Sequence, residues 1–192
     1  MIRVITQSEF FQGEHAIVHA LFEVGLMELL LRKPTASSSD IIDWIKGIDE
    51  QYRDRIVVYE QQVEQVEGVK GFHHKGNEQT ELAHTWYSRS CHGMDELVEF
   101  ENSYEYLVLS PIFKSLSKAN YGPEINWDLS SLSTGLKNKL IALGGISEQR
   151  LEELHQLGFK HIALLGAIWL SPDPILAFKT IDQKWGKYAQ KY

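Results

Sequence analysis

Hydroxyl, ammonium and imidazole groups gather in this sequence where apolar runs end. The stretch SPIFKSLSK (110–118) directly follows the apolar run YEYLVL (104–109) and brings Ser115, Ser117 and Lys118 together. Hydroxyl and ammonium groups are natural hydrogen-bond partners of phosphate oxygens. The stretch therefore predicts either a plain turn or a loop that holds a phosphorylated ligand.

The ends of the other apolar runs carry the same kinds of groups, together with bare glycine backbone: Arg32, Lys33, His73, Ser90, His92, Gly144, Gly145 and Gly166. Two adjacent cations suit an anionic ligand. A Gly-Gly pair in front of a helical segment presents backbone N–H groups to a phosphate. Together these groups predict an anion site, although the formal net charge of the protein is −7. Isolated histidines such as His155 and His161 are expected to be packing or surface residues.

The elements that must position these groups are short runs rich in Ile, Val and Leu. Eight such runs span residues 2–6, 26–31, 55–60, 69–74, 86–91, 104–110, 139–145 and 161–168. Several lack polar alternation, as expected of strands that are covered on both faces. Segments with helical periodicity lie between or after them, at 37–48, 94–101, 147–158 and 174–192. This alternation predicts a parallel α/β fold.

Two architectures fit this order of elements, a (β/α)8 TIM barrel and an open doubly wound sheet. The count of eight strands favours the barrel. An open sheet would also carry a glycine-rich phosphate loop after its first strand, where this sequence has only Gly13. We therefore expect a single compact (β/α)8 barrel domain over residues 1–192. In such a barrel the carboxyl ends of the strands meet at one mouth, which brings the polar groups together.

The overall composition argues against several classes of partner. The negative net charge and the lack of a basic cluster speak against nucleic acid, and no apolar run approaches the roughly 18 residues of a membrane span. The single cysteine, Cys91, and the lack of a signal peptide predict a cytoplasmic protein. Trp169, Trp185, Tyr188 and Tyr192 either cap the outer face of the barrel, which we favour, or line a homo-oligomer interface.

Six motifs in the chain resemble, in order, those of one known family. They are LLLRKP (29–34), GFHHKGN (71–77), SRSCHGMDEL (88–97), YLVLSPIFKSLSK (106–118), IALGGISEQRLEEL (141–154) and IALLGAIW (162–169). The family is that of thiamin phosphate synthase and its relative TenI, both (β/α)8 barrels. The third and fourth motifs are the most specific, whereas a Gly-Gly pair before a helix is common among phosphate-binding barrels.

The resemblance to the synthase implies condensation of hydroxymethylpyrimidine diphosphate with a thiazole phosphate, with magnesium as cofactor. The residues that match its pyrophosphate-binding motifs are Arg32, Lys33, Ser115, Ser117 and Lys118, and those that match its thiazole phosphate site are Gly144, Gly145 and Gly166. The resemblance to TenI implies tautomerisation of a carboxythiazole phosphate without a cofactor. His92 would then move the proton, with His73 and Ser90 in the substrate pocket.

Two departures from the synthase pattern favour the tautomerase over the synthase. Where the synthase carries Asn-Asp after its third strand, this chain has Tyr59 and Glu60, and Glu78 stands in for a later Asp. Magnesium requires oxygen ligands in near-ideal octahedral geometry, so Glu60 and Glu78 are metal ligands only if the synthase activity holds. We therefore expect a TenI-like tautomerase acting on a small phosphorylated heterocycle. The alternatives are a thiamin phosphate synthase and a non-catalytic binder of thiazole or thiamin phosphates.

Overall fold

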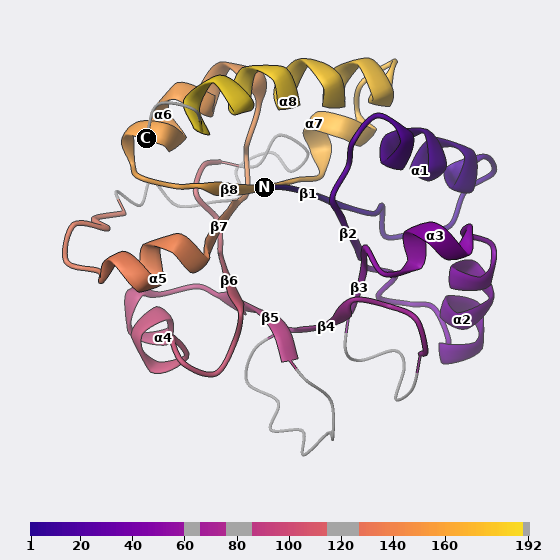
Figure 1. The fold of residues 1–192 in the computed structure, drawn as a ribbon, viewed down its shortest axis with the longest axis horizontal. Coiled ribbons are helices and arrows are strands. Elements are labelled where there is room, and N and C mark those ends of the chain that lie inside the picture. The colour runs from indigo at the N-terminus through magenta and orange to yellow at the C-terminus, as the bar shows by residue number, and fades with distance from the viewer. Residues whose placement is uncertain (60–65, 76–85, 115–126, 190–192) are drawn as a thin grey trace.

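The structure is a computed structural model that describes residues 1–59, 66–75, 86–114 and 127–189. Its eight strands follow one another around a closed, parallel barrel (Figure 1). They are β1 (Ile2–Ile5), β2 (Glu28–Leu31), β3 (Ile56–Tyr59), β4 (Gly71–His74), β5 (Trp86–Cys91), β6 (Tyr106–Leu109), β7 (Leu140–Leu143) and β8 (His161–Leu164). The predicted (β/α)8 barrel is confirmed.

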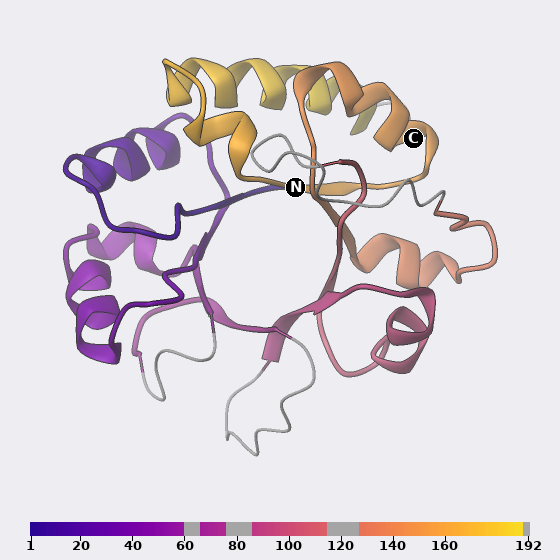
Figure 2. The same ribbon diagram turned by 180° about the vertical axis from the view of Figure 1, so that it is seen from behind.

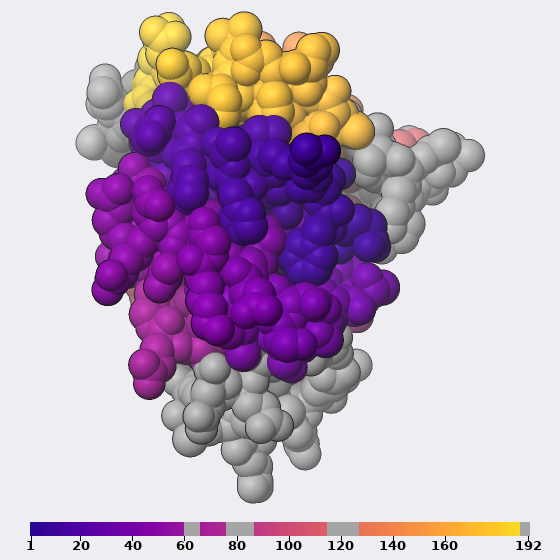
Figure 3. Space-filling view, turned by 90° about the vertical axis from the view of Figure 1, so that its right-hand side faces the viewer, coloured from indigo at the N-terminus to yellow at the C-terminus, as the bar shows by residue number. Residues whose placement is uncertain are grey.

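The described helices lie outside this ring of strands when it is viewed from either end (Figures 1 and 2). They are α1 (Glu14–Glu23), α2 (Ser38–Lys46), α3 (Glu50–Arg53), α4 (Met94–Glu99), α5 (Thr134–Lys139), α6 (Leu151–Gln156), α7 (Gly166–Trp169) and α8 (Pro174–Ala189), with a 3₁₀ turn η2 (Glu148–Arg150) before α6. Helix α8 packs against α1, α6 and α7. Figure 3 shows α8 lying above the side of the molecule that α1, α2 and α3 form.

Most strand residues are apolar on both faces of the sheet because the strands lie between the barrel interior and the outer helices. In β2, Leu29 and Leu31 belong to the outer core beneath the helices, whereas Leu30 belongs to the inner core of the barrel. This two-sided burial explains why the strand sequences show little polar alternation. The ladder closes where Ile2 of β1 pairs with Ile162 of β8.

Helix α2 begins as the sequence predicts. Ser37 is the N-cap, and its hydroxyl accepts from the Asp40 backbone N–H while the Asp40 carboxylate accepts from the Ser37 N–H. This reciprocal capping box satisfies two backbone donors that the first turn would otherwise leave unpaired. The apolar positions Ile41, Trp44 and Ile45 are then buried against the barrel.

Several elements differ from the expectation. The run 161–168 is not one strand, because β8 ends at Leu164 and Gly166 begins helix α7. Helices α3 and α5 have no counterpart among the predicted helical segments, and neither has helix α1. Its core-facing residues include Val18, Leu21 and Phe22. In the parts of the chain that the structure describes, no helix is long and apolar enough to cross a membrane.

Candidate active site

His92 directly follows β5, at the end of the barrel where the carboxyl ends of the strands meet, here called the mouth. Its Nδ1 lies 2.8 Å from the Ser110 carbonyl oxygen, and its backbone N–H donates to the Glu96 carboxylate at 3.0 Å. Because a carbonyl oxygen only accepts, Nδ1 must carry the proton of the neutral ring. Nε2 is then the basic nitrogen of an exposed imidazole. This is the arrangement that a general base requires.

His73 lies inside the barrel, one strand away from His92. Its Nδ1 is 2.9 Å from the Ser88 hydroxyl oxygen and its Nε2 is 2.8 Å from the Ser90 hydroxyl oxygen. Burial, followed by the positive charge of Arg3, holds the pKa of His73 well below its usual value. His73 is therefore a neutral imidazole held between two serines. The structure thus brings together His73 and Ser90, which were both predicted for the substrate pocket.

Arg32 lies at the mouth beside His73. Its guanidinium carbon is 5.5 Å from the centre of the Tyr59 ring, and that ring lies 5.6 Å from the His73 ring. One guanidinium nitrogen also donates to the Ser8 hydroxyl at 3.3 Å. The side chain is partly exposed, so its charge can reach a ligand at the mouth.

Lys33 does not have the position that the sequence predicts. Its side chain is completely buried, and its ammonium nitrogen lies 2.6 and 2.8 Å from the two carboxylate oxygens of Glu14. The Glu9 carbonyl oxygen is a third acceptor, at 2.9 Å. Burial lowers the pKa of Lys33, and the Glu14 carboxylate opposes this shift. Because an internal carboxylate already neutralises Lys33, we propose a structural role for it in place of the predicted phosphate-binding role.

The loop after β7 packs directly against the start of the stretch that follows β6. Gly144 and Gly145 both have positive φ, 103° and 62°. A Cβ atom on Gly145 would lie 2.7 Å from Cβ of Phe113. Non-bonded carbon atoms do not approach each other so closely. The two glycines therefore allow a close approach between the two loops that the sequence assigns to phosphate. Gly166, the third predicted phosphate-binding glycine, opens helix α7 after β8.

Five predicted residues lie outside the described parts of the chain: Glu60, Glu78, Ser115, Ser117 and Lys118. Among the described residues, no group of three or more His, Cys, Asp or Glu side chains could hold a metal ion. Tyr59, which takes the place of the family's Asn, lies beside the Arg32 guanidinium, and a cation there opposes a second cation. The described part of the mouth therefore does not fit magnesium.

A charged cluster that was not predicted lies inside the barrel below His73. Arg3 of β1 pairs with Glu28 of β2, and the second carboxylate oxygen of Glu28 lies 3.0 Å from the Lys70 ammonium. Arg3 also donates to Ser88 at 3.1 Å. The signal was present, because a single charged residue interrupts the apolar runs 2–6 and 26–31.

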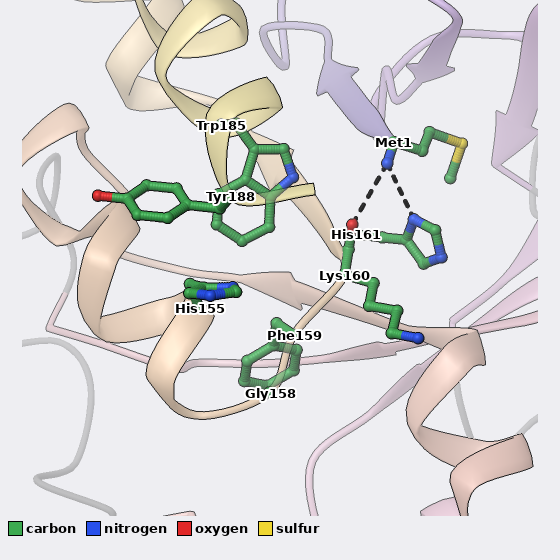
Figure 4. Close-up of a pocket in the computed structure, with 8 residues that line it drawn as sticks. All are labelled: Met1, His155, Gly158, Phe159, Lys160, His161, Trp185 and Tyr188. Atoms are coloured by element: carbon green, nitrogen blue, oxygen red, sulfur yellow. Dashed lines mark hydrogen bonds between the residues drawn. The ribbon is translucent and has the colours of Figure 1, made fainter. Parts of the chain in front are cut away.

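A cavity of about 270 Å³ lies at the opposite end of the barrel (Figure 4). It is lined by Met1, His155, Gly158, Phe159, Lys160, His161, Trp185 and Tyr188. In the structure the Met1 amino group lies 3.0 Å from Nδ1 of His161. Burial lowers the pKa of His161 to about 4, with the Met1 amino group as the second cause. Since catalytic groups of these barrels lie at the carboxyl ends of the strands, we do not assign this cavity to the reaction.

Comparisons with known proteins agree with the fold and the motifs. Residues 75–168 match the family model described as thiamine monophosphate synthase. A thiamine-phosphate synthase from Prochlorococcus marinus is 30% identical over 102 residues, 51% of this chain and 29% of that protein. A putative thiamine-phosphate synthase from Geobacter sulfurreducens is 31% identical over 87 residues, 44% of this chain and 41% of that protein. The chain thus matches less than half the length of these curated relatives.

Solved structures match over nearly the whole chain. A thiamine phosphate pyrophosphorylase from Bacteroides thetaiotaomicron has a TM-score of 0.74 and 27% identity, with 98% of this chain and 97% of that chain covered. A thiamine phosphate pyrophosphorylase from Pyrococcus furiosus has the same TM-score of 0.74 at 16% identity, covering 97% and 96% of the two chains. At that lower identity the likeness concerns the fold alone.

Proposed function

Since the chain belongs to the thiamin phosphate synthase and TenI family, we propose that it binds a thiazole phosphate at the mouth of the barrel. We further propose that it moves a proton on the heterocycle, with His92 as both base and acid. The observation that carries this proposal is the hydrogen bond from Nδ1 of His92 to the Ser110 carbonyl, 2.8 Å long. It leaves Nε2 as the proton acceptor at the mouth.

The reaction would be the tautomerisation of a carboxythiazole phosphate. Nε2 of His92 takes a proton from one ring position, and the imidazolium that results returns a proton to another position. The Ser110 carbonyl stabilises this imidazolium, because it keeps its hydrogen bond from Nδ1 throughout. Imidazole suits both steps since it titrates close to neutral pH. No atom is gained or lost, and no cofactor enters the step.

The phosphate group would be held beside this imidazole. Gly144 and Gly145 supply partly buried backbone after β7, and Gly166 opens the helix after β8. Phosphate sites at the loops after strands seven and eight are frequent in barrels of this kind. Lys118 and Arg32 would add positive charge, with Ser115 and Ser117 as hydroxyl donors.

Thiamin phosphate synthase is the second candidate function, and the names of the matched relatives support it. This reaction would place the pyrimidine diphosphate against Arg32, Ser115, Ser117 and Lys118, with magnesium on Glu60 and Glu78. Two observations favour proton transfer over it. Lys33 is neutralised by Glu14. Tyr59, which takes the place of the family's metal-binding Asn, lies beside the Arg32 guanidinium, which would oppose a metal cation.

One pair of assays separates the candidates. Carboxythiazole phosphate is incubated with the protein in D2O, and deuterium uptake at the ring is followed by NMR. We expect uptake with the wild type, a loss of about 10²- to 10⁴-fold for His92→Asn, and no change for His19→Asn, which alters a histidine on helix α1. Equal uptake in wild type and His92→Asn would sink the proton-transfer proposal.

The second assay adds hydroxymethylpyrimidine diphosphate, thiazole phosphate and magnesium and measures thiamin phosphate. Product formation that Glu60→Ala and Glu78→Ala both abolish would establish the synthase. Product formation unchanged in both variants would refute this metal site. Saturable binding of thiazole phosphate with neither proton exchange nor condensation would identify a non-catalytic binder and refute both enzymatic proposals.

A further inference from the structure

A continuous hydrogen-bonded chain runs through the barrel interior from Arg3 to Ser90. One guanidinium nitrogen of Arg3 lies 3.1 Å from the Ser88 hydroxyl oxygen, which in turn lies 2.9 Å from Nδ1 of His73. Nε2 of His73 then lies 2.8 Å from the Ser90 hydroxyl oxygen. Arg3, Ser88 and His73 are buried, whereas Ser90 is partly exposed, two residues before His92.

The direction of this chain is fixed at its buried end. A guanidinium group can only donate, so Ser88 accepts a hydrogen bond from Arg3. Among the described residues, the acceptor available to the Ser88 hydroxyl proton is Nδ1 of His73. A buried hydroxyl proton without an acceptor is unfavourable. Nδ1 therefore accepts, and the proton of the neutral ring sits on Nε2.

The direction of the hydrogen bonds is also fixed between His73 and the mouth. Nε2–H of His73 donates to the Ser90 oxygen, which leaves the Ser90 hydroxyl proton free to point away from His73. No described residue accepts that proton. Because Ser90 is partly exposed beside His92, its proton is directed to the space that a ligand would occupy.

His73 cannot act as an acid in this arrangement. A second ring proton would sit on Nδ1 and collide with the proton that Ser88 already directs there. Burial and the nearby cations Arg3, Arg32 and Arg89 also oppose a charged imidazole, as does His74. The ring is therefore neutral and has one tautomer over the physiological pH range.

We propose that His73 is a positioning residue whose tautomer, set by Arg3 through Ser88, makes Ser90 a hydrogen-bond donor to the ligand. The ligand atom that faces Ser90 is then an acceptor: a phosphate oxygen, a carboxylate oxygen or an unprotonated ring nitrogen. The inference rests on the proposed function only in placing a thiazole phosphate at this mouth. The tautomer of His73 is a property of the protein without ligand.

The tautomer is tested first, on the ligand-free protein. Histidine is labelled with ¹⁵N, and long-range ¹H–¹⁵N spectra are recorded from pH 8 to pH 5, with His73 assigned by its absence in His73→Gln. We expect a neutral ring with its proton on Nε2 throughout. A proton on Nδ1, or an imidazolium at pH 6, overturns the inference whatever the enzyme's activity. Deuterium uptake catalysed by His92 is measured separately, so the two failures are distinguishable.

The donor role of Ser90 is tested by calorimetric titration with carboxythiazole phosphate and with inorganic phosphate. We expect Ser90→Ala to bind the thiazole about tenfold more weakly, the loss of one hydrogen bond. A parallel loss for inorganic phosphate identifies the acceptor as a phosphate oxygen. A loss confined to the thiazole assigns it to the carboxylate or the ring nitrogen. Wild-type affinity of Ser90→Ala for both probes overturns the proposal.

A pair of His73 variants separates positioning from packing. The distal amide of His73→Gln retains an N–H group for Ser90, and we expect its affinity within about threefold of the wild type. His73→Leu removes that donor, and we expect the loss seen for Ser90→Ala. Equal losses in the two His73 variants overturn the positioning role. Circular dichroism checks the fold of each variant, and the spectra and the Ser90→Ala titrations decide the question if His73→Leu does not fold.

Discussion

Lys33 and Glu14 form a buried ion pair that joins the end of β2 to the first turn of α1, with 2.6 Å between the ammonium nitrogen and Oε1. The indole N–H of Trp44 donates to the other carboxylate oxygen at 2.9 Å, so α2 is tied to the same group. The Glu14 carboxylate connects β2, α1 and α2, so it stabilises the fold rather than binding a ligand. This explains why two adjacent cations after β2 have different environments.

Removal of the Lys33 charge should destabilise the barrel strongly. Lys33→Met leaves the Glu14 carboxylate buried without its cation, and we expect the free energy of unfolding to fall by about 3–5 kcal/mol. The double variant Lys33→Met/Glu14→Gln buries no charge and should lose less. Urea denaturation followed by tryptophan fluorescence measures both.

The matched control for that experiment is Lys46→Met. Lys46 and Asp43 form a pair whose side chains are 67% and 76% exposed, and exposed pairs contribute less than about 1 kcal/mol. A loss for Lys33→Met no larger than for Lys46→Met would contradict the structural role of the buried pair.

Acid should destabilise the protein below pH 6.5. The pKa of His161 is lowered to about 4, mainly by burial, and burial also lowers that of His73. Because imidazoles of the unfolded chain titrate near 6.5, the unfolded state binds more protons between pH 6.5 and about 4. Stability that is complete above pH 6.5 is therefore lost as the pH falls.

Calorimetric Tm values from pH 7.5 to 4.5 test this expectation. The slope of Tm against pH should be smaller for His161→Gln, because this variant lacks one of the two histidines whose pKa is lowered. An identical slope in wild type and His161→Gln would rule out a contribution from His161.

Substitution of Gly145 should affect both stability and phosphate binding. An added Cβ would lie 2.7 Å from Cβ of Phe113, so Gly145→Ala must push the two loops apart as well as strain a positive φ. Gly158→Ala provides the control, because Gly158 has a φ of 90° and nothing within 4 Å of the added atom.

We expect Gly158→Ala to lose about 1 kcal/mol in the free energy of unfolding, as a left-handed alanine does, and to bind inorganic phosphate normally. Gly145→Ala should lose more, with at least about tenfold weaker phosphate binding. Denaturation and calorimetric titration give the two values. Equal losses in both variants would mean that the close packing of the two loops contributes neither to the free energy of unfolding nor to phosphate binding.

The positive charge of Arg32 should matter for the ligand, unlike that of Lys33. Arg32→Gln removes a partly exposed guanidinium at the mouth, and hydrogen bonds to charged groups contribute about 1.5–3 kcal/mol. We expect KM for the phosphorylated substrate to rise by about 10- to 100-fold with a smaller change in kcat. Lys46→Gln removes an equal charge on the outside of the barrel, and KM should stay unchanged. If the two variants behave alike, Arg32 does not contact the ligand.

The barrel could be predicted from the sequence because its signal is local and repeated. Each strand is a short apolar run, such as the LLL of residues 29–31, and each needs only its own residues to be recognised. Helix α1 was not predicted because its apolar core-facing residues, Val18 and Leu21 among them, are few. They lie in a short segment that also contains charged residues and histidines. Its buried Glu14 also breaks the rule that charged residues face solvent.

The candidate site was predicted only as far as chain order determines position. His92, His73 and Ser90 lie at strand ends, and a barrel brings strand ends together whatever their sequences. The environment of Lys33 could not be predicted, since its partner Glu14 lies 19 residues earlier, on an unrecognised helix. The hydrogen-bonded chain from Arg3 to Ser90 likewise depends on side chains of β1, β4 and β5 meeting inside the barrel, which no local pattern reveals.

Closure of the ladder between β1 and β8 also affects how the protein behaves at high concentration. Each of the eight strands has a hydrogen-bonded neighbour on both sides. A sheet without free edges offers no row of unpaired N–H and C=O groups onto which a strand of another molecule could add. The native barrel is thereby protected from edge-to-edge aggregation, and that protection depends on β1 and β8 staying paired.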